Sequence, residues 1–297
     1  MIDLHTHSTH SDGCLTPQEL LSKALKIKLE ALALTDHDAI SGSIELLKLA
    51  KNQNIQIITG SELSVYYPDT DMEIIALNIP KKNLDNFMDY QTKELTRRQT
   101  LTLKRLEALQ KLGYNVTYDE VAYDEKGNLR TQIRRPHFTD ILLKKGYISE
   151  PEVAYKTIFA KNSPARIEDK PLSAKEVIQF IKENNAKAFL AHPIHTKKSP
   201  QDLFETIKEL KSYGLDGIEV FHSSHLKKHR KLYLNIIKDL NLITSGGSDF
   251  HGAKAHPKNK LGTGKHYNLN IPYLVLENIF SKSKPTNQYY QELEKHI

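Results

Sequence analysis

The sequence has one cysteine and no tryptophan among its 297 residues. Because the single thiol of Cys14 cannot pair within the chain, an intramolecular disulfide framework is excluded. A zinc site built on several thiolates is excluded for the same reason. Any metal ion that this chain holds must therefore be bound by histidine and carboxylate side chains.

Long hydrophobic runs are absent as well. No apolar stretch approaches the roughly 20 residues needed to span a bilayer, and the first residues lack the basic and apolar regions of a signal peptide. We therefore expect no membrane association and a cytoplasmic location. The 39% of hydrophobic residues is enough for a sizeable core in one large domain or two ordinary ones.

The positive charge is unevenly distributed along the chain. The formal net charge is +6, and residues 81–170 hold 18 Lys or Arg against 13 Asp or Glu. A local basic excess predicts attraction of an anionic partner such as a phosphate or nucleic acid, or else a solvated helical face. The composition leaves both interpretations open.

Short apolar runs typical of buried strands recur along the chain. Seven strands are predicted, at 2–4, 31–35, 55–60, 74–78, 186–191, 217–221 and 242–245. Helix start signals follow at Thr16-Pro17, at Ser173 with Glu176 three residues on, and at Ser199-Pro200. This alternation predicts an α/β fold with a parallel sheet, and seven strands favour a small barrel over an eightfold one.

The alternation stops in the middle of the chain, where a broken apolar stripe of helical period includes Leu106 and Leu109. We therefore predict a barrel domain made of residues 1–82 and 171–297, and an inserted helical domain of residues 83–170. The last dozen residues are predicted to be a peripheral tail.

Titratable side chains cluster close to the predicted strand ends. In chain order they are His5, His7, Asp12, His37, Glu62, His192, Asp249 and His251. In a parallel α/β barrel the carboxyl ends of the strands converge on one face, where such folds build their sites. His5 and His7 are two residues apart, so in an extended chain both rings point to the same side, a spacing suited to gripping one cation.

Bringing five imidazoles and three carboxylates together without water is costly, because each buried unpaired charge is strongly unfavourable. Two or three divalent ions would neutralise the carboxylates and remove that cost. A shell of histidine and carboxylate ligands without thiolate fits Mn²⁺, Fe²⁺ or Zn²⁺.

The motifs HTHSTHSDG, TDHD, GSE, RRPHF, AHP and GSDFHG resemble those of the PHP (polymerase and histidinol phosphatase) superfamily. Together with GIEVFHSSH they look most like the stand-alone branch of nucleoside 3′,5′-bisphosphate phosphatases and 5′→3′ exoribonucleases of short RNA. The resemblance covers nearly the whole chain. It implies a distorted seven-stranded (β/α)7 barrel with an inserted helical domain.

The resemblance also implies a division of the metal ligands among three sites. The first is formed by His5, His7, Glu62 and Asp249, the second by Glu62 and His192, and the third by Asp12, His37 and His251. Mn²⁺ is the ion expected first, with Fe²⁺ or Zn²⁺ as alternatives. His10 is not part of this pattern.

One position departs from the family pattern. Where the family usually offers a histidine at the start of the fourth strand, this chain has Glu73. A carboxylate can bind Mn²⁺ or Fe²⁺ and would add negative charge. Glu73 is therefore predicted either as a ligand of the second ion or as a water-facing residue of a hairpin.

The resemblance places Arg135 and His137 over the metals as phosphate-binding groups, with Arg134 beside them. A guanidinium offers a bidentate fork to phosphate oxygens. The alternative is an ordinary helix start at which the arginines are exposed.

Other polar residues near the strand ends have less specific expectations. His222 is expected at the same mouth with a substrate or proton-transfer role, although helix capping by Ser223 or the next serine is the ordinary interpretation of that segment. Asp36 and Asp38 are predicted to orient ring nitrogens of the ligands. Glu219 is expected to be an internal hydrogen-bond acceptor.

The predicted activity is metal-assisted hydrolysis of the 3′-phosphate of a nucleoside 3′,5′-bisphosphate, with stepwise cleavage of short 5′-phosphorylated RNA in addition. His192 or His251 would protonate the leaving oxygen if not fully occupied as a ligand. Arg134 and Arg135 are expected to anchor the 5′-phosphate. The alternatives are a histidinol-phosphate phosphatase and a non-catalytic nucleic-acid-binding module, and no obligate protein partner is inferred.

Overall fold

A computed structural model describes residues 1–68, 70–125, 127–130, 132–167, 171–253 and 257–297. Seven strands form one sheet in which the spatial order is the chain order. They are β1 (Ile2–Asp3), β2 (Ala31–Leu34), β3 (Gln56–Tyr67), β4 (Thr70–Leu77), β5 (Lys187–Leu190), β6 (Gly217–His222) and β7 (Ile243–Gly247). A separate short hairpin pairs β8 (Asn259–Lys260) with β9 (Gly264–Lys265).

The sheet curls until its first and last strands meet. The Leu4 amide donates to the Gly246 carbonyl at 3.1 Å, and Thr6 forms a parallel bridge with Phe250. The predicted seven-stranded barrel is therefore confirmed. The expectation that every strand is parallel is wrong, because β4 runs antiparallel to both β3 and β5.

The reversed strand β4 forms a long hairpin with β3, which the pattern of apolar runs did not predict. β3 continues past the predicted end at Gly60 as far as Tyr67, and β4 returns along it from Thr70, so no helix separates the two. Glu62 consequently lies inside a strand rather than after one. From Glu62 to Val65 polar and apolar residues alternate, which is the pattern of a strand with two different faces.

Helices surround the barrel and connect its strands. They are α1 (Pro17–Lys26), α2 (Ser41–Leu49), α7 (Ala174–Glu183), α8 (Pro200–Tyr213), α9 (Lys227–Asp239), α10 (Tyr273–Phe280) and α11 (Asn287–Glu294), with short 3₁₀ turns η1 (Lys81–Asn83) and η2 (Pro193–Thr196). The predicted start signals are confirmed, because the side chains of Thr16, Ser173 and Ser199 each accept a hydrogen bond from the backbone of the first turn.

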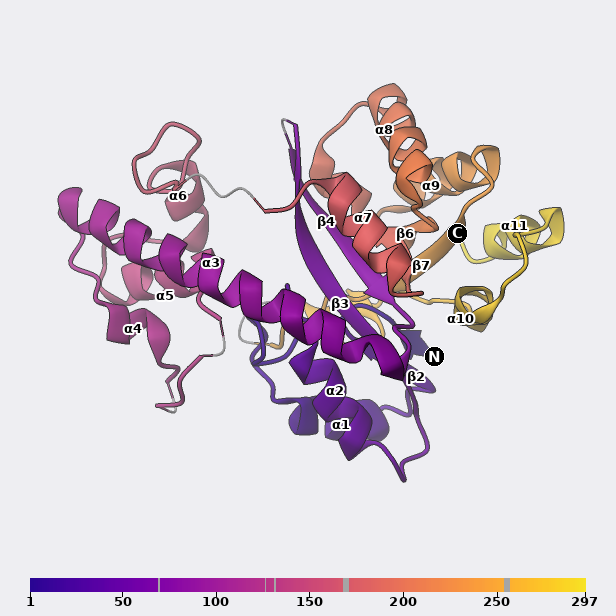
Figure 1. Ribbon diagram of the computed structural model, residues 1–297, viewed down its shortest axis with the longest axis horizontal. Helices are drawn as coiled ribbons and strands as arrows, with labels where there is room; N and C mark the ends of the chain where they lie inside the picture. The colour runs from indigo at the N-terminus through magenta and orange to yellow at the C-terminus, as the bar shows by residue number, and fades with distance from the viewer. Residues whose placement is uncertain (69, 126, 131, 168–170, 254–256) are drawn as a thin grey trace.

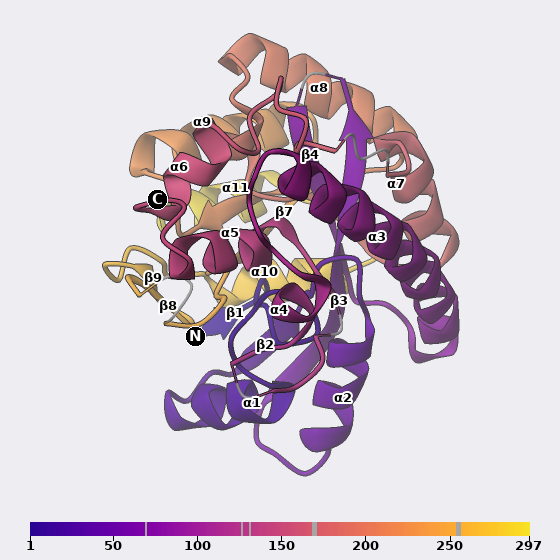
Figure 2. The same cartoon turned by 90° about the vertical axis from the view of Figure 1, so that its left-hand side faces the viewer.

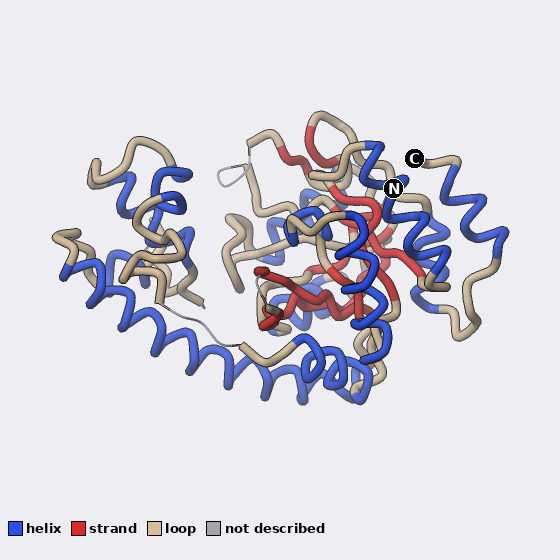
Figure 3. The backbone as a smooth tube through the Cα atoms, turned by 90° about the horizontal axis from the view of Figure 1, so that it is seen from above, coloured by secondary structure: helices blue, strands red, loops and turns tan. Residues whose placement is uncertain are grey.

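The middle of the chain is helical, as predicted. It contains α3 (Leu84–Lys111), α4 (Tyr118–Ala122), α5 (Arg135–Lys144) and α6 (Pro151–Lys156). The long helix α3 leaves the barrel, and the three shorter helices gather around its far half (Figure 1 and Figure 3). Phe87 near one end of α3 packs in the barrel core, whereas Leu106 and Leu109 pack with Phe138 in a second core. The predicted end of the insert, Lys170, lies outside the described residues.

The expected peripheral tail is instead a helix that closes the core. Tyr289, Tyr290 and Leu293 of α11 are buried against the barrel side of the molecule. The Tyr289 hydroxyl accepts from the Thr244 amide at 3.0 Å, which ties α11 to β7. No helix among the described residues is both long and apolar enough to cross a membrane.

Candidate metal centre

The predicted ligands meet at one end of the barrel. His5 and His7 follow β1, His37 follows β2, His192 follows β5, and Asp249 follows β7. Glu62 and Glu73 project from the β3–β4 hairpin, while Asp12 and His251 come from loops next to β1 and β7. Figure 2 shows α4 and α5 in front of the barrel strands. The structure thus brings all nine predicted ligands into one cluster beneath the helical region.

His5, His7, Glu62 and Asp249 form the first group. The two Nε2 atoms of His5 and His7 lie 3.1 Å apart. Glu62 Oε2 is 3.2 Å from His5 Nε2 and 3.4 Å from His7 Nε2. Asp249 Oδ1 is 3.6 Å and 3.2 Å from the same two nitrogens. Two carboxylate oxygens and two ring nitrogens therefore surround one small volume.

Glu62 shares its other oxygen with a second group. Glu62 Oε1 is 2.9 Å from His192 Nε2, and Glu73 Oε2 is 3.4 Å from that same nitrogen. Glu73 Oε1 also lies 3.2 Å from His37 Nδ1. The Glu73 side chain is only 24% exposed and points into the cluster, so the alternative of a water-facing hairpin residue is wrong.

Asp12, His37 and His251 form the third group. Asp12 Oδ1 is 3.2 Å from His251 Nε2 and 3.8 Å from His37 Nε2. His7 reaches the same group, since its ring stacks on that of His251 with centroids 4.0 Å apart. His7 therefore joins the first and third groups.

Several buried atoms of the cluster make no hydrogen bond within the described chain. They are His7 Nδ1, Asp12 Oδ1, His37 Nδ1 and Glu62 Oε2. Although His37 Nδ1 lies only 3.0 Å from Glu62 Oε2, neither atom makes a hydrogen bond. Buried polar atoms without hydrogen bonds are rare, and their presence calls for an ion or another ligand. The donor set and these orphaned atoms fit divalent cations.

The pKa shifts within the cluster also support the binding of divalent cations. Burial alone would raise the pKa of Glu62, but the charges of His5 and His37 outweigh it and hold the pKa well below its usual value. Burial opposes protonation of His192, yet the hydrogen bond and charge of Glu62 raise its pKa to about 9. Without metal, protonated imidazoles must therefore balance the carboxylates, and metal binding replaces those protons.

Three residues at this end of the barrel have unusual backbone conformations. His192, Asp249 and Asp38 adopt positive φ angles of 24°, 56° and 52°. Such conformations are uncommon for residues other than glycine and cluster at functional sites. The sequence carries no signal for this, because none of the three is glycine.

Asp36 and Asp38 do not orient ring nitrogens, contrary to the prediction. Asp36 accepts from the amide and hydroxyl of Ser8, both at 2.7 Å, and from the hydroxyl of Ser11 at 2.6 Å. Its role is to shape the loop between His7 and Asp12. Asp38 instead binds arginine side chains of the helical region and holds that region against the barrel.

Asp38 receives two arginines from different parts of the helical region. Arg98 of α3 contacts Asp38 Oδ2 directly and reaches Ser64 Oγ at 3.1 Å. Arg134 Nη1 lies 3.4 Å from Asp38 Oδ2. Arg134 also lies 3.7 Å from Asp12 Oδ2 and 3.8 Å from Glu73 Oε1. Arg134 is therefore engaged by carboxylates, and Arg98 is a site residue that the sequence analysis missed.

His137 and Arg135 lie at the start of α5. His137 is 4% exposed, and its Nδ1 accepts the Arg134 amide at 3.0 Å. Burial, together with the charge of Arg130, lowers the pKa of His137 to about 4, so the ring is neutral at pH 7. Nearby, the Gln132 side chain donates to the His37 carbonyl at 2.6 Å, which holds this segment against the metal cluster.

His222 is buried beside the cluster rather than in a helix cap. Its Nε2 points at Asp249 Oδ2 from 3.6 Å, and its Nδ1 accepts the Ser224 amide at 3.1 Å. The N-cap of α9 is Leu226, so capping by Ser223 or Ser224 is wrong. Because Nδ1 accepts, the neutral ring carries its proton on Nε2 and can donate to Asp249 or to a ligand.

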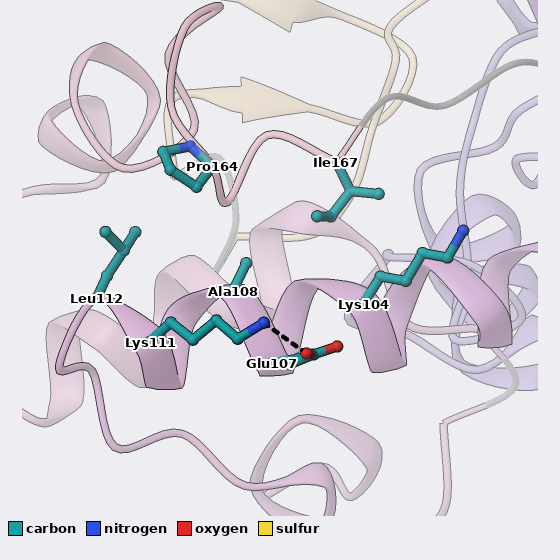
Figure 4. A pocket seen from close by; sticks show the side chains of 7 residues that line it. All are labelled: Lys104, Glu107, Ala108, Lys111, Leu112, Pro164 and Ile167. Atoms are coloured by element: carbon teal, nitrogen blue, oxygen red, sulfur yellow. Dashed lines mark hydrogen bonds and ion pairs between the residues drawn. The ribbon is translucent and has the colours of Figure 1, made fainter.

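His10 lies outside the cluster. Its Nδ1 is 2.8 Å from Ser41 Oγ, and its Nε2 is 3.0 Å from Glu45 Oε2. Both ring nitrogens are thus used on α2. A hollow of about 460 Å³ on the helical region is separate from the cluster. Lys104 and Ala108 of α3 line it, with Leu112 just after the helix, across from Pro164 and Ile167 (Figure 4).

Comparison with known proteins places these features in context. A family model described as PHP domain matches residues 3–187. A 5′-3′ exoribonuclease of Haemophilus influenzae is 30% identical over 253 residues, which cover 84% of this chain and 89% of the relative. A phosphoribosyl 1,2-cyclic phosphate 1,2-diphosphodiesterase of Eggerthella lenta is 28% identical over 275 residues, covering 91% and 98%.

Two further similarities concern substrate and structure. A 3′,5′-nucleoside bisphosphate phosphatase of Chromobacterium violaceum is 27% identical over 256 residues, covering 84% of this chain and 87% of the relative. A solved structure from Bifidobacterium adolescentis, described as a metal-dependent phosphoesterase, has a TM-score of 0.77 at 26% identity. That comparison covers 99% of this chain and 96% of the other.

Proposed function

Because this chain belongs to the PHP domain family, we propose that it is a metal-dependent phosphoesterase that removes the 3′-phosphate of nucleoside 3′,5′-bisphosphates. Stepwise 5′→3′ cleavage of short 5′-phosphorylated RNA would use the same site. Relatives named for each of these activities cover more than four fifths of the chain.

The observation that carries the proposal is the cluster of five histidines and four carboxylates with orphaned buried atoms at its centre. We propose that it holds two or three divalent ions, Mn²⁺ first and Fe²⁺ or Zn²⁺ as alternatives. The ligand sets are those of the three groups described above, with Glu73 completing the second. Bound ions would supply Lewis acidity, which neutralises phosphate charge and makes water more acidic.

The chain's own residues then have distinct tasks. Glu62 faces the first and second groups with its two oxygens, so it fixes the spacing between them. His192 and His251 are the proposed proton donors to the leaving oxygen, since burial opposes but carboxylates favour their protonated forms. His222 would donate the proton on its Nε2 to a ligand bound beside Asp249.

The helical region, which we propose to be a substrate-capping domain of residues 83–170, supplies the groups that bind the nucleotide. Arg135 and His137 lie at the start of α5, and the charge of Asp12 acts on His137. Arg134 is the weaker candidate for binding the second phosphate, because three carboxylates already surround it. Its role would be to hold the capping domain over the metals.

A substrate panel with metal control tests the proposal. Purified protein is stripped with a chelator, reloaded with Mn²⁺, Fe²⁺ or Zn²⁺, and assayed on adenosine 3′,5′-bisphosphate, a 5′-phosphorylated trinucleotide, histidinol phosphate and ribose 5-phosphate 1,2-cyclic phosphate. We expect the bisphosphate to be converted to the 5′-monophosphate only in the reloaded protein.

Each other outcome names a competing function. Preferred turnover of the cyclic phosphate would support the activity named for the Eggerthella lenta relative, and preferred turnover of histidinol phosphate would support a histidinol-phosphate phosphatase. If no substrate is hydrolysed with any of the three ions, the result would support a non-catalytic nucleic-acid-binding module.

A further inference from the structure

Two stretches of chain next to the metal centre are rich in lysine and contain no acidic residue. Residues 223–238 have five Lys or Arg, residues 250–276 have four Lys, and neither stretch has Asp or Glu. Their combined positive charge exceeds the formal net charge of +6 of the whole chain. The first stretch begins directly after His222 and the second directly after Asp249, so both start at the metal cluster.

Hydrogen bonds join the two stretches to each other and to the metal centre. The Asn268 side chain, just after the β8–β9 hairpin, donates to the Ser223 carbonyl at 2.8 Å, and the Asn268 carbonyl accepts from Arg230 of α9 at 2.7 Å. Asn259 of β8 donates to the Asp249 carbonyl at 3.0 Å. The start of α9 and the hairpin therefore form one continuous surface that is fixed beside a predicted metal ligand.

Six lysines of these stretches have no acidic partner in the described part of the chain. They are Lys227, Lys228, Lys231, Lys258, Lys260 and Lys265. Together with Tyr267 they form what we call the lysine surface. By contrast, Lys111 and Lys208 elsewhere each pair with a glutamate of their own helix. Lys227 and Lys228 lie in the first turn of α9, where the helix dipole adds to their positive charge. Such a surface attracts a polyanion.

An exposed aromatic ring lies among the lysines. Tyr267 is 69% exposed, and Lys260 Nζ donates to its hydroxyl at 2.7 Å. His266 and Tyr267 have positive φ angles of 54° and 59°, which are uncommon for residues other than glycine and cluster at ligand-binding sites. Proteins bind single-stranded nucleic acid with this combination, because bases stack on the aromatic ring while cations contact the phosphates.

We propose that the lysine surface binds the part of a single-stranded RNA that follows the nucleotide held at the metal centre. The helical region is held on the β2–β3 side of the barrel, through Asp38 and Ser64, whereas the lysine surface lies on the β6–β7 side. A strand that leaves the metals on that side passes over the lysines. The inference rests on the proposed function for the identity of the polyanion, and it adds that affinity rises with the length of the RNA.

The first test measures binding to Mn²⁺-loaded protein by fluorescence anisotropy. The probes are a 5′-phosphorylated RNA of ten nucleotides and a trinucleotide, both with phosphorothioate linkages that slow hydrolysis. The test variant carries Lys227→Gln, Lys228→Gln and Lys258→Gln, and the matched control carries Lys51→Gln, Lys208→Gln and Lys295→Gln at other exposed positions.

We expect the test variant to bind the longer RNA roughly tenfold more weakly than the wild type and the control do, with trinucleotide binding unchanged. Because each lost phosphate contact lowers the slope of log affinity against log salt concentration by about 0.7, that slope should fall by about two.

The second test concerns the aromatic ring. Tyr267→Asn removes the ring but keeps a residue that tolerates the left-handed backbone conformation. We expect affinity for the longer RNA to fall by roughly five- to a hundredfold, the range for loss of one base stacked on an aromatic side chain. Tyr273→Asn, at the exposed start of α10, is the control and should leave this affinity unchanged.

Equal affinity of the triple lysine variant and its control for the longer RNA would overturn the proposal. Tighter binding of the wild type to phosphatidylglycerol vesicles than to this RNA would also overturn it, in favour of a membrane surface. If the wild type binds the RNA through these lysines but hydrolyses neither RNA nor bisphosphate, the proposed function fails and the lysine surface stands. If it hydrolyses the bisphosphate but binds the longer RNA no more tightly than the trinucleotide, the lysine surface is refuted and the proposed function stands.

Discussion

His5 Nδ1 lies 3.1 Å from Glu219 Oε1, on the opposite side of the imidazole from the metal cluster. Both side chains are completely buried. The other oxygen of Glu219 accepts the His192 amide at 2.9 Å, where the chain adopts its positive φ. One carboxylate on β6 thus orients a ligand that follows β1 and another that follows β5.

Glu219→Gln should weaken metal binding without removing a ligand. An amide presents a donor on one side, so it cannot accept from both His5 Nδ1 and the His192 amide. Loss of such an outer partner typically costs about ten- to a hundredfold in metal affinity or activity. Affinity is measured by competition with a fluorescent chelator, with exposed Glu183→Gln as the control. An affinity equal to that of the control would show that Glu219 is only a packing residue.

Glu73 should determine the occupancy of the second metal group. Glu73→Gln removes a charge from between His37 and His192, so we expect one equivalent less of bound metal and at least a tenfold loss of kcat. Glu73→His should restore the equivalent and shift preference towards Zn²⁺. Metal content is measured by elemental analysis of protein dialysed against each ion. Full occupancy in Glu73→Gln would exclude Glu73 from the ligands.

Asp38→Asn should detach the helical region from the barrel. Burial alone would raise the pKa of Asp38, but Arg98 and Arg134 hold it well below its usual value, so the carboxylate is charged at neutral pH. Removing it takes away the buried carboxylate that Arg98 and Arg134 share, and breaking a buried ion pair costs about 3–5 kcal/mol. Urea unfolding should show this loss, whereas Glu107→Gln, which breaks only an exposed pair with Lys111, should leave stability nearly unchanged.

His137 should make the protein sensitive to acid. Its folded pKa of about 4 lies below the ordinary value of 6.5, so between these two values the unfolded chain binds more protons. Stability is therefore complete above pH 6.5 and is lost as the pH falls towards 4. His137→Gln keeps an acceptor for the Arg134 amide but does not titrate. The unfolding free energy of the variant should fall less steeply over this range, and parallel curves would contradict the assignment.

The strands and most of the ligands could be predicted because buried barrel strands are short continuous apolar runs. His5, His37 and His192 stand directly after such runs, so a reader of the sequence can place them on one face. The direction of β4 could not be predicted in this way. The direction follows from the antiparallel pairing of β4 with β3, in which Tyr67 lies opposite Thr70, whereas the apolar run of β4 looks the same in either direction.

The roles of Arg98 and Tyr289 could not be predicted, because each depends on a partner far away in the sequence. Arg97 and Arg98 are adjacent, yet Arg97 bonds Glu94 on its own helix while Arg98 reaches Asp38 in the barrel. A rotation of about 100° per residue separates the two, and only the docking of α3 decides which one faces the metals. The burial of Tyr289 likewise depends on its contact with β7, which no local pattern encodes.

Asp38 has a consequence for the exchange of parts between relatives. Two separate stretches of the helical region converge on this single carboxylate, so the region is not a cassette that can be transplanted by matching its two chain ends alone. A chimaera that carries a foreign cap on this barrel needs guanidinium groups equivalent to both Arg98 and Arg134. With only one of them, the foreign region would be covalently linked to the barrel but would lack one of the two contacts with Asp38 that hold it over the metal cluster.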